Sequence, residues 1–253
     1  MAYTTIDKPS DYFNTVLWTG NNTGTTREIT GVGFTPNLIW SKRRSGADAS
    51  HQLYDTIRGT QKILITESTS AEITSNVYGA ITTFGSDGYT WTNGSDGTNP
   101  RWFFNESDTY CSWNWKAGTS FTNDASSTGI GTIDSTGSVN TDAGFSIISY
   151  TGTGSNGTVA HGLGVAPKMI ICKGRSFSSS AHWLTYHEAM GNTSAMKLNL
   201  TSAKETTVYY WNNTSPTSST FSLGASTEAN SSSATFIAYC FAEKQGYSKF
   251  GSY

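Results

Sequence analysis

Charged residues are scarce in this sequence, at 13% of the chain. Lys and Arg number 16 and Asp and Glu 18 among 253 residues, which gives a formal net charge of −2. A nucleic-acid-binding surface needs a broad basic face that displaces counterions from phosphates. The densest basic cluster is Lys42-Arg43-Arg44, which we interpret as a solvated strand end. We therefore expect no nucleic acid partner.

Long apolar runs and cysteines are also scarce. No stretch approaches the about 18 consecutive apolar residues of a membrane-spanning helix, and the opening residues 1–8 lack the apolar core of a secretory signal. The three cysteines, Cys111, Cys172 and Cys240, are odd in number and match no zinc-ligand spacing. We expect no membrane insertion, no disulfide framework and no cofactor, and a protein that stays in a cytoplasm until it is assembled or released.

Aromatic residues are abundant. The chain has 8 Trp, 13 Tyr and 12 Phe in a background rich in Ser, Thr, Gly and Asn, which predicts loop-rich units with aromatic cores. Over residues 111–116, Cys and two Trp alternate with Ser, Asn and Lys. This period of two predicts a strand with one buried apolar face and one wet polar face. Helical periodicity is nearly absent.

The chain contains two collinear copies of one pattern. Gly31-x-Gly33-x-x-Pro36 recurs as Gly162-x-Gly164-x-x-Pro167, and the aromatic segment 109–115 recurs as 235–241. We predict an all-β fold of two tandem β-sandwich-like repeats of about 100 residues, either separate sandwiches or halves of one fused domain. The predicted divisions are repeat 1 over 1–117, a Ser/Thr/Gly-rich linker over 118–143, repeat 2 over 144–245, and a C-terminal strand over 246–253.

The glycine-rich pattern has a structural interpretation. A dinucleotide-binding loop with this spelling must be followed by a helix. Here the residues after Pro36 and Pro167 have strand character. Because proline fixes its own φ and glycine tolerates tight reversals, we interpret the pattern as a turn that launches a strand.

Catalytic and metal-binding constellations are not apparent. His51 and His182 are repeat equivalents, which favours a role in the fold. His182, His187 and Glu188 could be drawn as metal ligands, but a metal site of that kind needs three well-placed groups. We predict no catalytic residues and no metal site. A carboxylate pair for glycoside hydrolysis stays open, because its spacing is set by the fold.

Three tryptophans lack a repeat partner of the same kind. Trp211 precedes Asn212 and Asn213, and Trp91 and Trp102 flank a polar loop. Exposed Trp beside Asn or Asp is typical of surfaces that stack on sugars, whereas burial in the core is the alternative. These five residues are our candidate surface or glycan contacts.

Several motifs carry a resemblance to a known family. They are 162–168, 211–216, 239–243, 246–253 and the opening 1–7 with 12–16. Across essentially the whole chain, these segments resemble tandem-repeat, β-rich virion or tail-fibre-like proteins of tailed bacteriophages of marine bacteria. The resemblance implies a location in the virion and other virion proteins as partners. It implies no catalytic residues.

The C-terminal segment 246–253 resembles 144–150, the predicted opening strand of repeat 2. We predict that Tyr247, Phe250 and Tyr253 belong to a docking strand that completes a neighbouring sheet, in this chain or in an adjacent subunit. Such proteins are commonly symmetric homo-oligomers, and a trimer is our expectation.

Three functions follow from these observations. The first is a non-enzymatic phage structural protein: a tail fibre, a spike or a capsid decoration module that acts by subunit docking and surface display. The second is a carbohydrate- or receptor-binding module that contacts host surface glycans through the Trp-bearing loops. The third is a glycan depolymerase, which would require a cleft with paired carboxylates.

Overall fold

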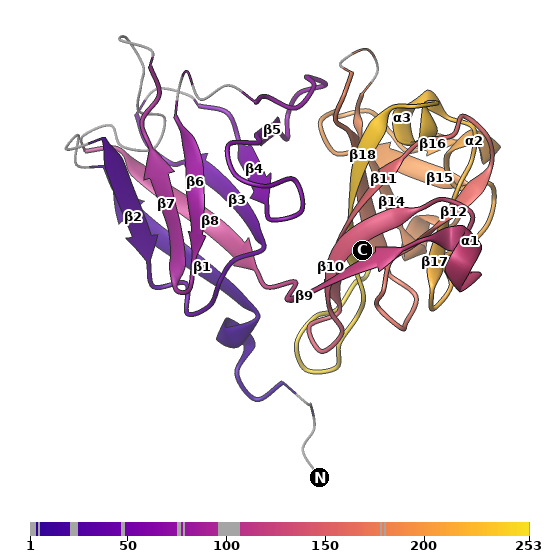
Figure 1. The fold of residues 1–253 in the computed structure, drawn as a ribbon, viewed down its shortest axis with the longest axis horizontal. Helices are drawn as coiled ribbons and strands as arrows, with labels where there is room; N and C mark the ends of the chain where they lie inside the picture. The colour runs from indigo at the N-terminus through magenta and orange to yellow at the C-terminus, as the bar shows by residue number, and fades with distance from the viewer. Residues whose placement is uncertain are drawn as a thin grey trace. The chain divides into compact units, whose positions relative to one another are not determined.

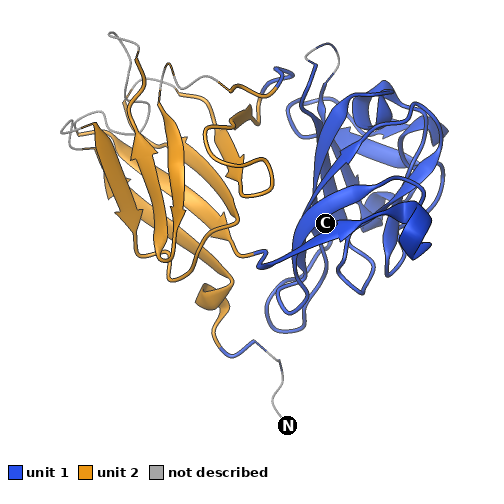
Figure 2. Cartoon of the chain, in the orientation of Figure 1, with its two compact units in different colours: residues 1–7, 68–71, 117–253 blue, residues 8–67, 72–116 orange. Residues whose placement is uncertain are grey.

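The chain is all-β, as the sequence predicts. The computed structural model describes residues 4, 6–20, 25–46, 49–74, 77, 79–95, 107–177, 179 and 181–252. Its helices are single turns of three or four residues between strands (Figure 1). The chain divides into two compact units (Figure 2). The N-terminal unit comprises 8–67 and 72–116, and the C-terminal unit comprises 1–7, 68–71 and 117–253.

The N-terminal unit is a β-sandwich. A five-stranded sheet has the order β1-β8-β3-β4-β5, and a three-stranded sheet has the order β2-β7-β6. Neighbouring strands in both sheets are antiparallel. The elements are η1 (Pro9–Asp11), β1 (Phe13–Thr19), β2 (Thr26–Thr30), β3 (Leu38–Arg43), β4 (Gln52–Asp55), β5 (Leu64–Ile65), β6 (Ala80–Gly85), β7 (Gly88–Thr92) and β8 (Thr109–Trp115).

The C-terminal unit has a larger sheet. Eight strands follow the order β16-β15-β14-β13-β18-β11-β10-β9, and β12 pairs with β17 separately. The elements are β9 (Thr119–Asn123), α1 (Ala125–Thr128), β10 (Ser135–Asn140), β11 (Phe145–Thr151), β12 (Gly157–Ala160), β13 (Met169–Gly174), β14 (Trp183–His187), η2 (Glu188–Met190), β15 (Ser194–Lys197), β16 (Glu205–Thr206), α2 (Val208–Trp211), β17 (Thr220–Leu223), α3 (Thr227–Asn230) and β18 (Thr235–Phe241).

The structure corrects the linker expected over 118–143. This segment supplies β9, α1 and β10, and β10 pairs with β11 along six residues. Phe121 and Val139 pack against the core of the C-terminal unit. Ser, Thr and Gly therefore mark a polar edge of a sheet here, and not a connection outside the fold.

The five strands of the N-terminal sheet correspond in order to five strands of the eight-stranded sheet. The order β1-β8-β3-β4-β5 has the same pattern as β11-β18-β13-β14-β15. The pairing register corresponds as well, because Trp115 lies opposite Phe13 and Leu38. In the C-terminal unit Phe241 lies opposite the aligned residues of β11 and β13.

The glycine-rich turn launches a strand in both units. Gly31 and Gly33 both have a φ of 87°, in the left-handed region that favours glycine. Their amides donate to the Asp87 carboxylate at 3.1 and 2.6 Å, and β3 starts at Leu38. These contacts support the structural interpretation of the motif and leave no helix where a dinucleotide loop would need one.

Polar side chains lie inside the N-terminal sandwich. Ser112 and Asn114 of β8 are fully buried, whereas Trp113 and Trp115 are half-buried on the opposite face. The Asn114 side-chain amide donates to the Ser112 hydroxyl at 3.0 Å and to a β1 carbonyl at 3.1 Å. The period of two predicted over 111–116 is present from Ser112 to Trp115, but there the polar side chains are buried and the tryptophans are half-buried, whereas Cys111 is buried as predicted. Hydrogen bonds inside the sandwich offset part of the free-energy cost of burying these polar side chains.

Aromatic and aliphatic residues fill both cores. The N-terminal core contains Ile29, Ile39, Tyr54, Ile63, Ile65, Ala80, Ile81, Tyr89, Trp91 and Tyr110. The C-terminal core is larger, and its central strand β18 has five consecutive buried residues, 236–240. Because β18 is buried on both faces, its sequence is a nearly continuous apolar run and does not alternate.

Candidate functional site

The structure buries two of the predicted Trp contacts. Trp91 is 1% exposed and packs edge-to-face on Tyr54, with ring centroids 5.8 Å apart. Trp211 is 2% exposed, and its indole Nε1 donates to the Ser194 carbonyl at 3.1 Å. Neither ring can stack on a sugar. The prediction that these two residues are surface contacts is therefore wrong. Both rings are packed in the cores, where large aromatic side chains are commonly found.

Asn212 and Asn213 lie at the end of α2. Asn212 and Asn213 have φ values of 50° and 48° and form the left-handed end of α2. Asn212 accepts a hydrogen bond from Asn156 at 2.9 Å, and Asn213 is exposed. Asn tolerates this conformation better than most residues, so the pair has a structural explanation. Trp102 lies outside the described residues.

The C-terminal segment is not a strand in its described part. Residues 246–252 contain no strand, and Gly246 has a φ of 76° in a turn where Lys244 bridges to Ser248. The Phe250 ring lies 6.2 Å from the His187 ring, and Tyr247 is half-buried. This corrects the predicted docking strand over these residues, because a turn cannot present a row of edge hydrogen bonds. Tyr253 lies outside the described residues.

The cysteines are buried thiols. Burial raises the pKa of Cys172 to about 12 and also raises the pKa values of Cys111 and Cys240. The thiolate is the nucleophile and the metal ligand, so these environments oppose both roles. No group of three or more His, Cys, Asp or Glu side chains is placed to hold a metal ion within the described ranges.

His161 is a buried neutral histidine. It is 0% exposed, its Nε2 lies 3.2 Å from the Thr217 carbonyl, and its Nδ1 accepts from the Leu163 amide at 3.2 Å. These partners fix the tautomer with the proton on Nε2. Burial lowers the pKa of His161 to about 4. The ring therefore joins β12 and the glycine turn to the 217–220 loop as a neutral group.

Two carboxylates line a shallow cavity of about 260 Å³ beside β10. Asp124 accepts from the Ser126 hydroxyl at 2.7 Å and the Ser127 amide at 3.0 Å, and Asp134 accepts from the Ala125 amide at 2.8 Å. The hydrogen bonds to Asp124 lower its pKa. A glycosidase acid needs a raised pKa, so Asp124 is suited to capping α1 and not to proton donation.

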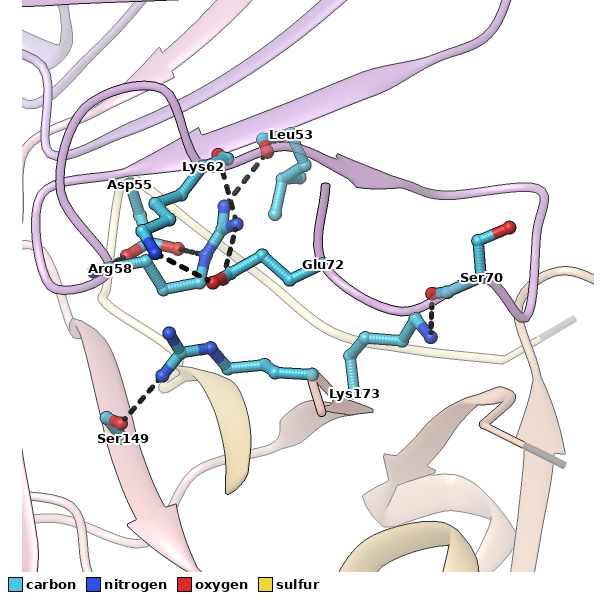
Figure 3. A network of polar contacts seen from close by, with 9 residues as sticks. Leu53, Asp55, Arg58, Lys62, Ser70, Glu72, Ser149 and Lys173 are labelled. Atoms are coloured by element: carbon cyan, nitrogen blue, oxygen red, sulfur yellow. Dashed lines mark hydrogen bonds and ion pairs between the residues drawn. The ribbon is translucent and has the colours of Figure 1, made fainter. Parts of the chain in front are cut away.

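A buried ionic network organises the loop after β4 (Figure 3). Arg58 pairs with Asp55 at 2.5 Å and with Glu72 at 3.3 Å, and it donates to the carbonyls of Leu53 and Lys62 at 2.9 and 3.1 Å. Every one of these contacts is within the N-terminal unit. Because the guanidinium has five donors in a fixed fork, this arrangement clamps a long connection in place.

The C-terminal unit buries a lysine. Lys173 is 0% exposed, and its ammonium donates to the Ser70 carbonyl at 2.9 Å (Figure 3). It also donates to the carbonyls of Ala181 and Thr69 at 2.8 and 3.3 Å. Burial lowers the pKa of Lys173 to about 8. Three carbonyls match the three ammonium protons, so the group holds the 68–71 segment against β13.

The open side of β1 is the feature that distinguishes the two units. In the C-terminal unit β11 lies between β18 and β10. Its counterpart β1 pairs with β8 and ends its sheet, with no strand on its other side among the described residues. Leu17 in β1 is 61% exposed, and it aligns with Ser149 of the covered strand β11.

Hydrogen-bond parity identifies the free groups of β1. At the two ends of the ladder with β8, Lys116 donates to the Tyr12 carbonyl and Gly20 donates to the Asp108 carbonyl. Because bonded pairs alternate in an antiparallel ladder, the even residues of β1 face β8. The backbone groups of 13, 15, 17 and 19 therefore point to the open side. The Thr15 amide there is bonded by the Asn14 side chain at 2.9 Å.

A second open edge lies at β9. The bonds from Gly152 to Ala234 and from Ala242 to Gly144 set the parity of β11 against β18, and the strand registers carry that parity through β10 to β9. The backbone groups of Ser120 and Thr122 then point away from β10. Both side chains are exposed.

Comparison with known proteins assigns a family to the chain. A family model described as a domain of unknown function, DUF7483, matches residues 8–253. The chain belongs to this family. The match includes the strands of both units. No curated protein and no solved structure matches the chain.

No helix in the described part of the chain is long and apolar enough to cross a membrane. The site that emerges from the structure is a pair of sheet edges, β1 and β9, which sequence reasoning missed. One sequence signal was available: residues 118–143 have no counterpart in the first repeat. They supply β9 and β10, so the second repeat has strands beside β11 for which the first repeat has no equivalent beside β1 among the described residues.

Proposed function

We propose that this protein is a non-enzymatic structural component of a bacteriophage particle that acts by subunit docking through its sheet edges. The observation that carries the proposal is that the edge of β1 is open among the described residues, whereas the equivalent edge of β11 is covered by β10. A sheet edge with free backbone groups is a template for another strand. We place the protein in a phage particle because its sequence motifs resemble those of phage virion proteins.

The condition of the polar groups supports a structural role. Hydrogen bonds to neighbouring chain segments engage the side chains of Arg58, Lys173 and Asp124. The depressed pKa of Asp124 and of Asp87 keeps these carboxylates ionised, which is unsuited to general-acid catalysis. The glycan-binding alternative loses Trp91 and Trp211 as stacking surfaces because both rings are buried.

The test is to find the protein in virions of the phage that encodes it. Purified particles are analysed by quantitative mass spectrometry, and the copy number is then mapped by cryo-electron microscopy. Repeating density on the shell identifies a decoration protein, and density on the tail identifies a fibre or adaptor. Particles that lack the protein, purified from lysates that contain it, contradict the proposal.

A further inference from the structure

Among the described residues, two of the four end strands of the large sheets are the longer ones and have no strand on their outer side. β1 has seven residues and β9 has five, and neither contains a charged residue or a proline. The opposite ends, β5 and β16, are two residues each. Natural sheets blunt their edges with charges, prolines or very short strands. The β5 and β16 ends follow that rule, and β1 and β9 do not.

The C-terminal unit shows what covers this kind of edge. There the outward backbone groups of β11 bond to β10, a strand of the same chain. In the N-terminal unit the equivalent groups of Leu17 and Thr19 have no strand beside them in the part of the chain that the structure describes. The covered state of this edge is therefore an antiparallel strand rich in Ser and Thr.

We propose that β1 of one copy pairs antiparallel with β9 of a second copy. β9 is the strand next to β10 and shares its Ser/Thr character, with Ser120 and Thr122 offering backbone groups on the open side. Every copy carries both edges, one on each unit, so copies of this chain alone can satisfy both. Pairing β1 with β1 would leave each β9 open. The contact also shields Leu17, which is 61% exposed.

This contact is heterologous, because the two surfaces differ. Heterologous contacts close into rings when the rotation permits and otherwise extend as filaments. A three-membered ring is the trimer expected from sequence, and a filament is a fibre. The inference rests on the proposed structural function and specifies its partner as a second copy of the chain.

The experiment blocks each edge separately. Leu17→Pro removes an amide on the open side of β1, and Thr122→Pro removes one on the open side of β9. Proline is tolerated on edge strands where the lost N–H faces solvent. Val208→Pro is the matched control, because Val208 is 43% exposed, lies outside both edges and occupies the first position of α2, where proline is favoured.

Sedimentation velocity over a concentration series measures the result. Wild type and Val208→Pro are expected to self-associate, and each edge variant is expected to weaken association by more than about tenfold. An equal mixture of the two edge variants is expected to form dimers and nothing larger. The intact β9 of Leu17→Pro pairs with the intact β1 of Thr122→Pro, and the two edges left over are the blocked ones. Circular dichroism verifies folding. If a proline variant is unfolded, Leu17→Lys and Ser120→Lys test the same edges with a charge.

Three outcomes overturn the inference. Wild type that stays monomeric at every concentration removes the contact. Association that persists in Thr122→Pro alone indicates β1–β1 pairing in its place. A mixture of edge variants that behaves like its separate components excludes head-to-tail pairing. These results are independent of the virion experiment: a virion protein that is monomeric with insensitive edges overturns only this inference, and absence from virions overturns only the proposed function.

Discussion

Acidification is expected to destabilise the C-terminal unit through His161. The ring is fully buried and neutral, with its nitrogens bonded to the Thr217 carbonyl and the Leu163 amide. Burial lowers its pKa from 6.5 to about 4. Because the unfolded chain takes up this proton and the folded chain does not, the free energy of unfolding falls as the pH falls.

The magnitude follows from the two pKa values. The stabilisation is complete above pH 6.5 and is lost as the pH falls toward 4. At about pH 5, proton uptake by the unfolded state alone amounts to roughly 1.5 pKa units, or about 2 kcal/mol. Asp87 and Asp124 have lowered pKa values and lose their stabilising contribution at lower pH. Lys173, whose pKa burial lowers to about 8, also contributes near pH 8, so the interval between about pH 6.5 and 5 isolates the histidine.

Urea unfolding at about pH 8, 6.5 and 5 measures the effect. The wild type is expected to lose about 2 kcal/mol between about pH 6.5 and 5. His161→Gln keeps a polar side chain of similar size without a titrating group, so its curve is expected to be nearly flat over the same interval. An equally steep loss in His161→Gln would refute the assignment to this ring.

Three further variants test the structural account. Arg58→Met removes the buried ion pairs of Arg58 with Asp55 and Glu72 and is expected to cost about 3–5 kcal/mol in urea unfolding; a neutral result would contradict the clamp. Trp211→Ala is expected to cost about 3–5 kcal/mol through cavity formation, and a stable variant that lost glycan binding would restore the surface reading. Gly137→Ala places a Cβ 2.6 Å from a β11 carbonyl and is expected to cost about 1–3 kcal/mol, whereas Gly251→Ala, with nothing within 4 Å, is expected to change stability by less than about 0.5 kcal/mol.

The all-β fold could be predicted because period-two patterns and turn residues are local signals. The strand over 111–116 is an example, since its alternation is present in β8. Which face is buried could not be predicted, because the buried Asn114 side chain donates to the neighbouring Ser112 hydroxyl and to the Asn14 carbonyl of β1, a strand about 100 residues away in sequence. Long-range partners decide that question.

The predictions of exposed rings at Trp91 and Trp211 and of a strand over 246–252 were wrong for a similar reason. An Asn next to Trp211 suggests a surface, but the ring direction depends on what α2 packs against. The 246–253 segment resembles β11 in sequence, yet a strand needs a partner edge and Gly246 is in a turn. The 118–143 segment has the composition of a loop, but Ile133 belongs to the core of the C-terminal unit and Phe121 and Val139 pack against it.

Hydrogen–deuterium exchange along β1 tests the central claim most directly. The amides of Leu17 and Thr19 face the open side, whereas the aligned Ser149 amide faces β10. In dilute protein we predict fast exchange at Leu17 and Thr19 and slow exchange at Ser149. In the assembled particle we predict that Leu17 and Thr19 become protected while Ser149 stays slow. Protection at Leu17 in the dilute monomer, or continued fast exchange in the assembly, would contradict docking through this edge.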